Sequence, residues 1–272
     1  MAKSALLKSS IAKKYWMALT GLFLCLFLVG HLAGNLQLIF GDALQFNKYA
    51  LFMTTNPAVK LLSYLTYISI IFHAVDGIML TIQNKKARPV AYAMSSPQNS
   101  SSLASRNMAV LGTVILIFIA THMTNFWAKM HFDKNMPLQK ITIEMQPGMK
   151  NDFYITTDGG YVPANDPSYV IKNKTEIFDA NVNVKIKDAY KDLHKITIDF
   201  FKDKDYGLAF TIFYVLSMAV LAFHLLHGFQ SAFQSLGINN KFTPTIKTFG
   251  MLFAIIVPLL FAIIPLYIHF VK

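Results

Sequence analysis

Four long apolar stretches of the sequence each contain a histidine. These are His31, His73, His122 and His224, and His227 follows three residues after the last of them. An imidazole is costly to bury without a partner, and an ionisable side chain inside a membrane helix indicates function. Paired imidazoles from facing helices are how a membrane bundle holds haem iron. Four histidines on four successive stretches therefore favour two haem-binding pairs over isolated, hydrogen-bonded core residues.

The elements that must position these histidines are five apolar segments, each long enough to cross a bilayer, which takes about 20 residues. The chain of 272 residues is 54% hydrophobic and only 14% charged, which is typical of a membrane protein and not of a soluble domain. We therefore expect an all-α membrane protein built as a bundle of five transmembrane helices. The expected helices lie near residues 15–40, 60–83, 106–127, 207–235 and 245–270.

The net charge of +11 is distributed as a signal of membrane topology. Residues 128–205 contain twelve carboxylates and twelve basic residues, so the positive surplus lies in the segments that flank the apolar runs. With the N-terminus inside, ten basic residues fall on the inner side and three on the outer side, as the positive-inside rule requires. We therefore expect a cytoplasmic N-terminus, an extracytoplasmic C-terminus and no nucleic-acid partner.

A polar segment, residues 128–205, separates the third and fourth apolar runs. It combines turn signals such as Pro-Gly and Asp-Gly-Gly with short β-prone runs such as DFYITT. We expect residues 1–127 to form the first three helices, 128–205 an outer-facing insertion of mixed structure, and 206–272 the last two helices. The insertion contains no recognisable catalytic motif.

The expected depth of each histidine sorts the four into two pairs. His31 and His122 lie past the midpoints of outward-running helices, which places both toward the outer side. His73 and His224 lie past the midpoints of inward-running helices, which places both toward the inner side. At about 1.5 Å per residue, the two levels are roughly 10 Å apart. Two pairs at two levels match two stacked b haems, whereas a metal site gathers its ligands at one level.

Glycine spacing supports the inner pair and separates His224 from His227. FHAVDG and FHLLHG each place a glycine, Gly77 or Gly228, four residues after the first histidine. A missing side chain one turn from a ligand lets a flat porphyrin lie close to the backbone, although glycine also serves plain helix packing in membranes. By this match His224 binds the iron. His227 then takes the place of Asp76, beside the ligand or near a propionate.

The motifs GHLAGN, FHAVDG, ATHMTNFW and AFHLLHGFQSAF, in this order, resemble the di-haem cytochrome b anchor of succinate:quinone oxidoreductases. The resemblance covers essentially all the membrane part of the chain. It is closest to the single-chain, five-helix type found in succinate dehydrogenase and fumarate reductase of menaquinone-using bacteria. The 128–205 insertion is a departure, because it is far longer than the connection expected there.

The resemblance implies a multi-pass protein of the bacterial cytoplasmic membrane that binds two haems b and has no catalytic residue of its own. A flavoprotein subunit oxidises succinate, and an iron–sulfur subunit docks on the inner face near the basic N-terminus and the 84–106 loop. Electrons pass from the inner haem (His73, His224) to the outer haem (His31, His122) and reduce menaquinone near the outer side. The chain also contacts membrane lipid, and a homo-oligomer of the whole complex is left open.

The resemblance also implies further, less specific contacts. Ser10 and Lys14 look like a Ser-x-x-x-Arg entry to the first helix, which serves a quinone or haem-propionate contact in related anchors, with lysine replacing arginine. Arg106 and His227 are further propionate candidates. Most members of the expected outer quinone site would serve equally as interface anchors. They are Asn35, Gln37, Asp42, Asn125, Trp127 and His131.

Two other functions stay open at this point. The same anchor would serve a fumarate reductase that runs from menaquinol to fumarate, because the dicarboxylate site lies on another subunit. A transporter with a histidine relay belongs to a different class, and it predicts charges scattered through the bundle and usually an internal repeat. Asp76 is the only clear carboxylate expected inside the bundle.

Overall fold

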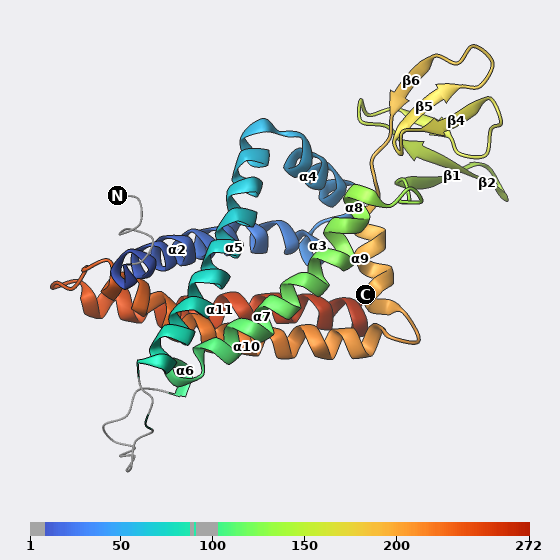
Figure 1. Ribbon diagram of the computed structural model, residues 1–272. Helices are drawn as coiled ribbons and strands as arrows, with labels where there is room; N and C mark the ends of the chain where they lie inside the picture. Colours follow the sequence, from blue (N-terminus) through green and yellow to red (C-terminus); the bar gives the residue numbers. More distant parts are fainter. Residues whose placement is uncertain (1–8, 88–89, 91–102) are drawn as a thin grey trace, which may run out of the picture. The chain divides into compact units, whose positions relative to one another are not determined.

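The computed structural model describes residues 9–87, 90 and 103–272 (Figure 1), and helices make up most of this part of the chain. Five helices among these residues are long and apolar enough to span a membrane, which confirms the expected multi-pass architecture. The spans are Ile11–Phe40, Pro57–Lys86, Met108–Phe132, Gly207–Ser235 and Thr243–Phe270.

The helices carry the labels of Figure 1, and one of them is a π-helix. They are α2 (Ser10–Asn35), α3 (Gln37–Phe40), α4 (Ala43–Thr55), α5 (Pro57–Lys86), α6 (Leu103–Arg106), α7 (Met108–His122), the π-helix η2 (Met123–Ala128), α8 (Lys129–Phe132), α9 (Leu193–Lys202), α10 (Gly207–Ser235) and α11 (Thr243–Phe270).

The chain divides into two compact units. The first comprises the described residues of 1–35, 61–120 and 209–267, and so contains most of the five long helices. The second comprises residues 36–60, 121–208 and 268–272. It contains α3, α4, α9 and all the strands, and therefore includes the whole of the 128–205 segment.

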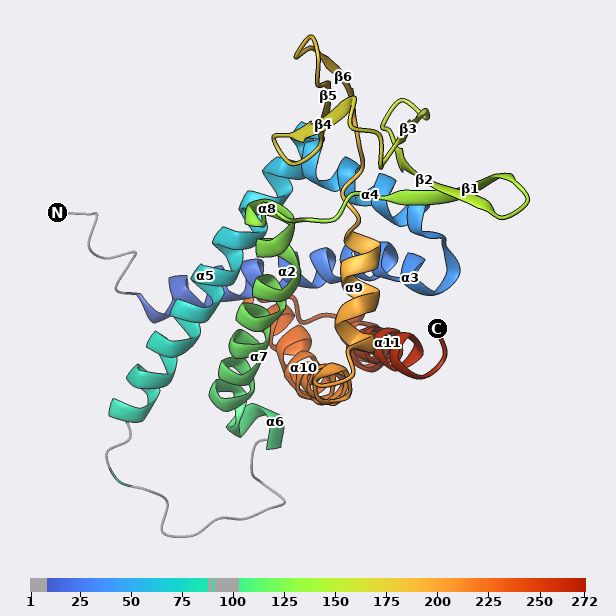
Figure 2. The same ribbon diagram turned by 90° about the vertical axis from the view of Figure 1, so that its right-hand side faces the viewer.

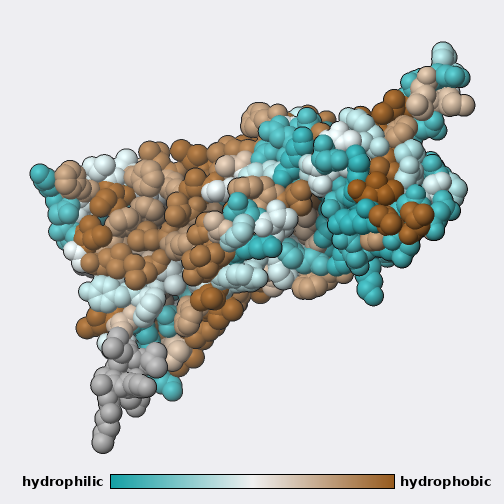
Figure 3. All heavy atoms as spheres, turned by 90° about the horizontal axis from the view of Figure 1, so that it is seen from above, coloured by the Kyte–Doolittle hydropathy of each residue, from teal (hydrophilic) through white to brown (hydrophobic). Residues whose placement is uncertain are grey.

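The first unit has a core formed by α2, α10 and α11. Cys25, Leu225, Phe229 and Ala254 are buried together there. Close approach of α10 and α11 requires Gly250, because a Cβ at that position would collide with the Phe229 ring. Large apolar side chains cover the outside of the long helices, and Figure 3 shows this hydrophobic surface. Such a surface suits a lipid environment.

The second unit contains two antiparallel three-stranded sheets, which confirms a sheet-containing region between the third and fourth long helices. The strand orders are β1-β2-β3 and β4-β5-β6, and the β1–β2 hairpin tip points away from the second sheet in Figure 1 and Figure 2. The β-prone run DFYITT falls largely in β2, and α9 follows the sheets. The strands are β1 (Lys140–Gln146), β2 (Met149–Ile155), β3 (Tyr161–Pro163), β4 (Tyr169–Lys172), β5 (Glu176–Asp179) and β6 (Lys185–Asp188).

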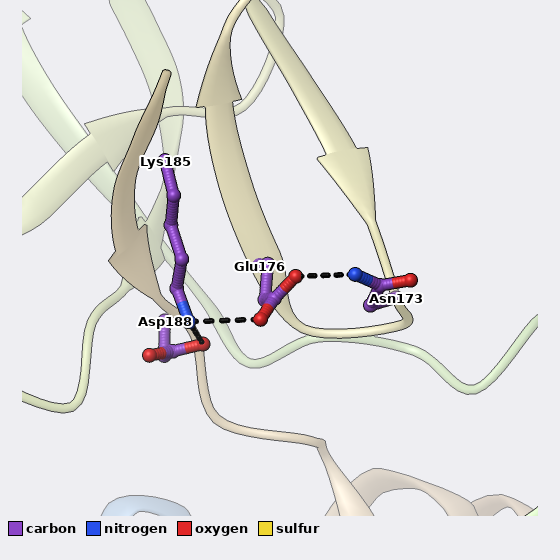
Figure 4. A network of polar contacts seen from close by, with 4 residues as sticks. All are labelled: Asn173, Glu176, Lys185 and Asp188. Carbon is purple, nitrogen blue, oxygen red and sulfur yellow. Dashed lines mark hydrogen bonds and ion pairs between the residues drawn. The ribbon is translucent and has the colours of Figure 1, made fainter. Parts of the chain in front are cut away.

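A polar network holds the second sheet together at one end (Figure 4). Lys185 Nζ lies 2.9 Å from Glu176 Oε1 and 3.0 Å from Asp188 Oδ1, and Asn173 Nδ2 donates to Glu176 Oε2 at 2.5 Å. Lys185 and then Asn173 lower the pKa of Glu176, while Glu176 and then Asp188 raise the pKa of Lys185. Each partner therefore stabilises the charged form of the other. The side chains are partly exposed, so the network fixes strand register more than it adds stability.

One buried amide, Asn47 of α4, joins three parts of the second unit. Its Nδ2 donates to Gln139 Oε1 at 3.1 Å and to Asp192 Oδ1 at 2.9 Å. Its Oδ1 accepts from the backbone N–H of His194 at 3.0 Å, at the start of α9. The side chain therefore fixes α4 against the segments that precede and begin α9.

Replacing Asn47 with alanine is expected to lower the stability of the second unit. The change removes the Asn47 bonds to Gln139 Oε1 and to the His194 N–H, and each buried polar group left without a partner costs about 1–3 kcal/mol, whereas Asp192 Oδ1 still accepts from the Lys195 N–H. A lower midpoint of thermal unfolding and faster proteolysis within residues 128–205 would measure the effect. Asn165→Ala removes an exposed amide of the same unit and should change neither quantity. Equal unfolding midpoints and equal proteolysis rates in the two variants would show that the hydrogen bonds of Asn47 do not stabilise the second unit.

Candidate functional site

The rings of His73 and His224 lie together in the first unit. His73 is on α5 and His224 on α10, and their ring centroids are 6.1 Å apart with the ring planes at 69°. Two imidazoles bound axially to one metal by bonds of about 2 Å have centroids about 6 Å apart. The distance between these two rings therefore fits ligation of a single haem iron.

The second ring nitrogen of His73 faces α2. His73 Nδ1 lies 3.2 Å from the carbonyl oxygen of Met17 and 3.4 Å from Thr20 Oγ1. A metal-binding histidine commonly donates its other ring N–H to a backbone carbonyl, which fixes its tautomer and orientation. With Nδ1–H donated to Met17, Nε2 is the lone-pair nitrogen of His73. A Cβ at Gly21 would lie 3.1 Å from His73 Cε1, so the glycine permits this contact.

One ring nitrogen of His224, Nδ1, is buried and has no hydrogen-bond partner among the described residues. A buried polar atom without a partner is destabilising, so the position favours a bound group. On α7, a Cβ at Gly112 would lie 3.8 Å from His224 Cε1. Residues of α2, α5, α7 and α10 therefore all lie near this pair of histidines.

The two glycines one turn after the histidines are not explained by helix packing. A Cβ at Gly77 would have no described atom within 4 Å outside its own stretch of helix. A Cβ at Gly228 would meet only the methyl carbon of Met108 at 3.9 Å and His224 Cδ2 at 4.0 Å. Open space therefore lies beside both glycines, and the close approach of a flat ligand at these positions stays a prediction.

His31 lies nearer the C-terminal end of α2. Its ring stacks on Phe27 at a centroid distance of 5.2 Å and lies 5.7 Å from the ring of Phe261 of α11. Asn35 Nδ2 donates to the His31 backbone carbonyl at 2.8 Å and lies 3.4 Å from His31 Nε2. Gly21 lies against the His73 ring and so marks the level of the inner pair on α2. His31 lies ten residues further along the helix, which is about 15 Å. The sequence predicts roughly 10 Å between the inner and outer histidine pairs.

His122 is the last residue of α7, and the π-helix η2 begins directly after it. Its ring lies 5.4 Å from that of Phe126. π-helical turns are rare and occur frequently at functional sites, and no residue of MTNFWA predicts this one. His31 belongs to the first unit and His122 to the second. Their pairing around an outer haem stays a prediction.

The residues expected to contact a quinone or a propionate at the N-terminal end of α2 differ in burial, and their contacts stay predictions. Ser10 begins α2, while Lys14 is exposed and the neighbouring Lys13 is buried. Lys13 lies 18 residues before His31, which is five full helical turns and places both on one face of α2. Arg106 ends α6 and is exposed, and His227 is half-buried on α10.

The six candidate residues for a quinone site differ in the contacts that their side chains already make. Asn35 contacts His31, Asp42 accepts from the Gln45 backbone N–H at 2.7 Å as the N-cap of α4, and His131 Nδ1 lies 2.8 Å from the Trp127 carbonyl. Trp127 also stacks on the His131 ring at 4.6 Å. By contrast, Gln37 Oε1 and Asn125 Nδ2 are buried without a hydrogen bond to any described residue.

No family model, curated protein or solved structure matches this chain. The functional assignment therefore depends on the histidine contexts in the sequence and on the geometry around His73 and His224.

Proposed function

We propose that this chain is the cytochrome b membrane anchor of a succinate:quinone oxidoreductase, with two haems b, each bound by two histidines. The approach of His73 and His224 to a centroid distance of 6.1 Å is the observation that carries the proposal. Two ionisable side chains from helices far apart in sequence meet inside an apolar bundle, where such a pair is costly unless it binds something.

Each residue near this pair has a defined part in the proposal. When bound, haem b supplies one-electron redox chemistry. His73 and His224 would hold the haem iron, and ligation by two histidines suits electron transfer and not oxygen binding. The Met17 carbonyl orients the His73 ring through Nδ1, and Gly77 and Gly228 leave room beside the two ligands. His31 and His122 are proposed to bind the second haem.

The charge pattern supports the proposed orientation, and the proposed partners are those that the family resemblance implies. Lys85 and Lys86 form the exposed, basic last turn of α5. In the proposed orientation this end faces the cytoplasm. An iron–sulfur subunit would dock there and receive electrons from a flavoprotein that oxidises succinate. Menaquinone would be reduced near the opposite, extracytoplasmic side of the bacterial cytoplasmic membrane.

Among the quinone candidates, Asn125 and Gln37 each have a buried polar atom that makes no hydrogen bond to a described residue. Asn125→Leu is expected to raise the KM for a menaquinone analogue about fivefold, because one hydrogen bond to a quinone carbonyl contributes about 1 kcal/mol. Succinate-driven quinone reduction by the assembled complex would measure it, with haem content unchanged. Asn135→Leu, which changes an exposed amide, is the control. An unchanged KM for Asn125→Leu would remove this residue from the quinone site.

The proposal as a whole is tested by adding succinate to the purified, assembled complex. Both haems should become reduced, and a menaquinone analogue should reoxidise them. Haems that are reduced by dithionite but by neither succinate nor menaquinol would contradict an anchor of this enzyme family. Faster fumarate reduction by menaquinol than quinone reduction by succinate would assign the chain to a fumarate reductase instead.

A further inference from the structure

Strand β1 forms an open edge of the first sheet in the second unit. In the order β1-β2-β3 it pairs with β2 on one side, and no described strand pairs with its other side. Its residues are exposed, apart from the half-buried Ile143, and the β1–β2 hairpin points away from the second sheet (Figure 2). An open edge presents unpaired backbone N–H and C=O groups to any strand that can pair with them. β1 therefore has backbone hydrogen bonds still to make.

β1 differs from the other outer strands in length and composition. Natural edge strands are commonly kept very short or contain proline, which deters pairing with other chains. β3 has three residues and ends at Pro163, and β4 and β6 have four residues each. β1 has seven residues, of which Ile141, Thr142 and Ile143 are β-branched and favour an extended strand. Its pairing with β2 is regular as far as Glu144, where the register shifts. The stretch up to Glu144 therefore suits pairing with another strand.

The residues of β1 are complementary to an antiparallel second copy of themselves. With Thr142 of the two copies directly opposite, Ile141 lies opposite Ile143 of the second copy, and Lys140 lies opposite Glu144. The arrangement is symmetrical, so each of these contacts occurs twice. Because side chains alternate between the two faces of a sheet, the charged pairs lie on one face and the isoleucine pairs on the other. Cross-strand pairs of both kinds stabilise a sheet.

The two charged residues of this stretch have no ion-pair partner within the described part of the chain. Lys140 Nζ lies over the ring of Tyr154 at 5.2 Å, and Glu144 Oε1 accepts from the Gly148 backbone N–H at 2.8 Å. These contacts leave donors on the ammonium group and the second oxygen of the carboxylate for further bonds. A second copy would supply the opposite charge to each.

From these observations we infer that β1 is an interface between two copies of this chain. It pairs antiparallel with β1 of the second copy, centred on Thr142, and so joins the two first sheets into one continuous sheet. The inference does not depend on the proposed function. The pairing is short, so it suits copies that are confined to one membrane, where their effective concentration is high.

Cross-linking of the full chain in isolated membranes tests the interface. The sequence has one native cysteine, Cys25, and it is buried, so an added exposed cysteine acts alone. Thr142→Cys should form a disulfide between two copies under mild oxidation, because directly opposite Cβ atoms lie about 4.5–5.5 Å apart. Lys140→Cys is the matched control on the same strand. Its two copies would lie four residues apart along the strand, about 14 Å, and should form several-fold less dimer.

Exchange of the charges tests the register. In the Thr142→Cys background, Lys140→Glu should lower the dimer fraction about fivefold, because it places like charges opposite each other at two positions. Glu144→Lys should have the same effect. Co-expression of these two variants should restore the dimer, because each copy then supplies the charge that the other lacks. Failure of the mixture to restore it would contradict this register.

Protease resistance of residues 128–205 shows whether each variant is folded. A folded Thr142→Cys variant that forms no disulfide would overturn the interface, and so would equal cross-linking in Thr142→Cys and Lys140→Cys. A cross-link to a different protein would show that β1 receives another strand, and would also overturn it. If Thr142→Cys loses its protease resistance, co-expressed Ile141→Cys and Ile143→Cys copies must cross-link to each other for the inference to stand.

Discussion

The His224→Ala variant is expected to retain one haem and lose the other. His224 is one of two rings whose centroids lie 6.1 Å apart, and alanine leaves His73 as a single axial ligand. A haem with one protein ligand is held less tightly and gains an open coordination position. The b-type absorbance per chain should therefore fall to about half, and His73→Ala should give the same result because the proposal assigns both residues to one iron.

His227→Ala is the matched control for this experiment. His227 lies on the same helix, three residues from His224, and is also half-buried. It should keep both haems, because it is not part of the pair that faces His73. Loss of a haem in His227→Ala together with retention of both in His224→Ala would show that the ligand on α10 has been assigned to the wrong histidine.

Replacing Gly77 or Gly228 with valine is expected to remove the same haem while the helices remain folded. The described protein atoms leave room for a side chain at both positions, so packing alone predicts little change. If a porphyrin lies against these glycines, a branched side chain would occupy its place and haem binding would fail. Haem content would measure the loss, and circular dichroism would show that helix content is retained.

Ala219→Val is the control that shows whether a β-branched side chain in α10 by itself lowers haem content. Ala219 is exposed and nine residues before Gly228, which places the two on opposite faces of the helix. This variant should keep both haems. Full haem content in Gly77→Val and Gly228→Val would mean that no flat ligand lies against these glycines, and the inner site would have to be placed elsewhere.

Several features of this protein could be predicted from the sequence because they depend on local composition. The five spans follow from long apolar runs, and the sheet region follows from turn signals and β-prone runs. The pairing of His73 with His224 followed from their depths and from their matching glycine spacing, and the structure brings these two rings together.

Other features depend on contacts between distant residues, which a single sequence does not reveal. The bond from His73 to the Met17 carbonyl joins positions 56 residues apart. Nothing in MTNFWA distinguishes a π-helix from an α-helix, because the difference is one residue in the hydrogen-bonding pattern.

The central claim is that this chain binds two b haems through histidine pairs. The most direct measurement is a reduced-minus-oxidised visible spectrum of the purified protein, with haem counted per chain. We expect a b-type spectrum and two haems per chain. A protein purified intact from a haem-replete membrane that shows no b-type band would contradict it.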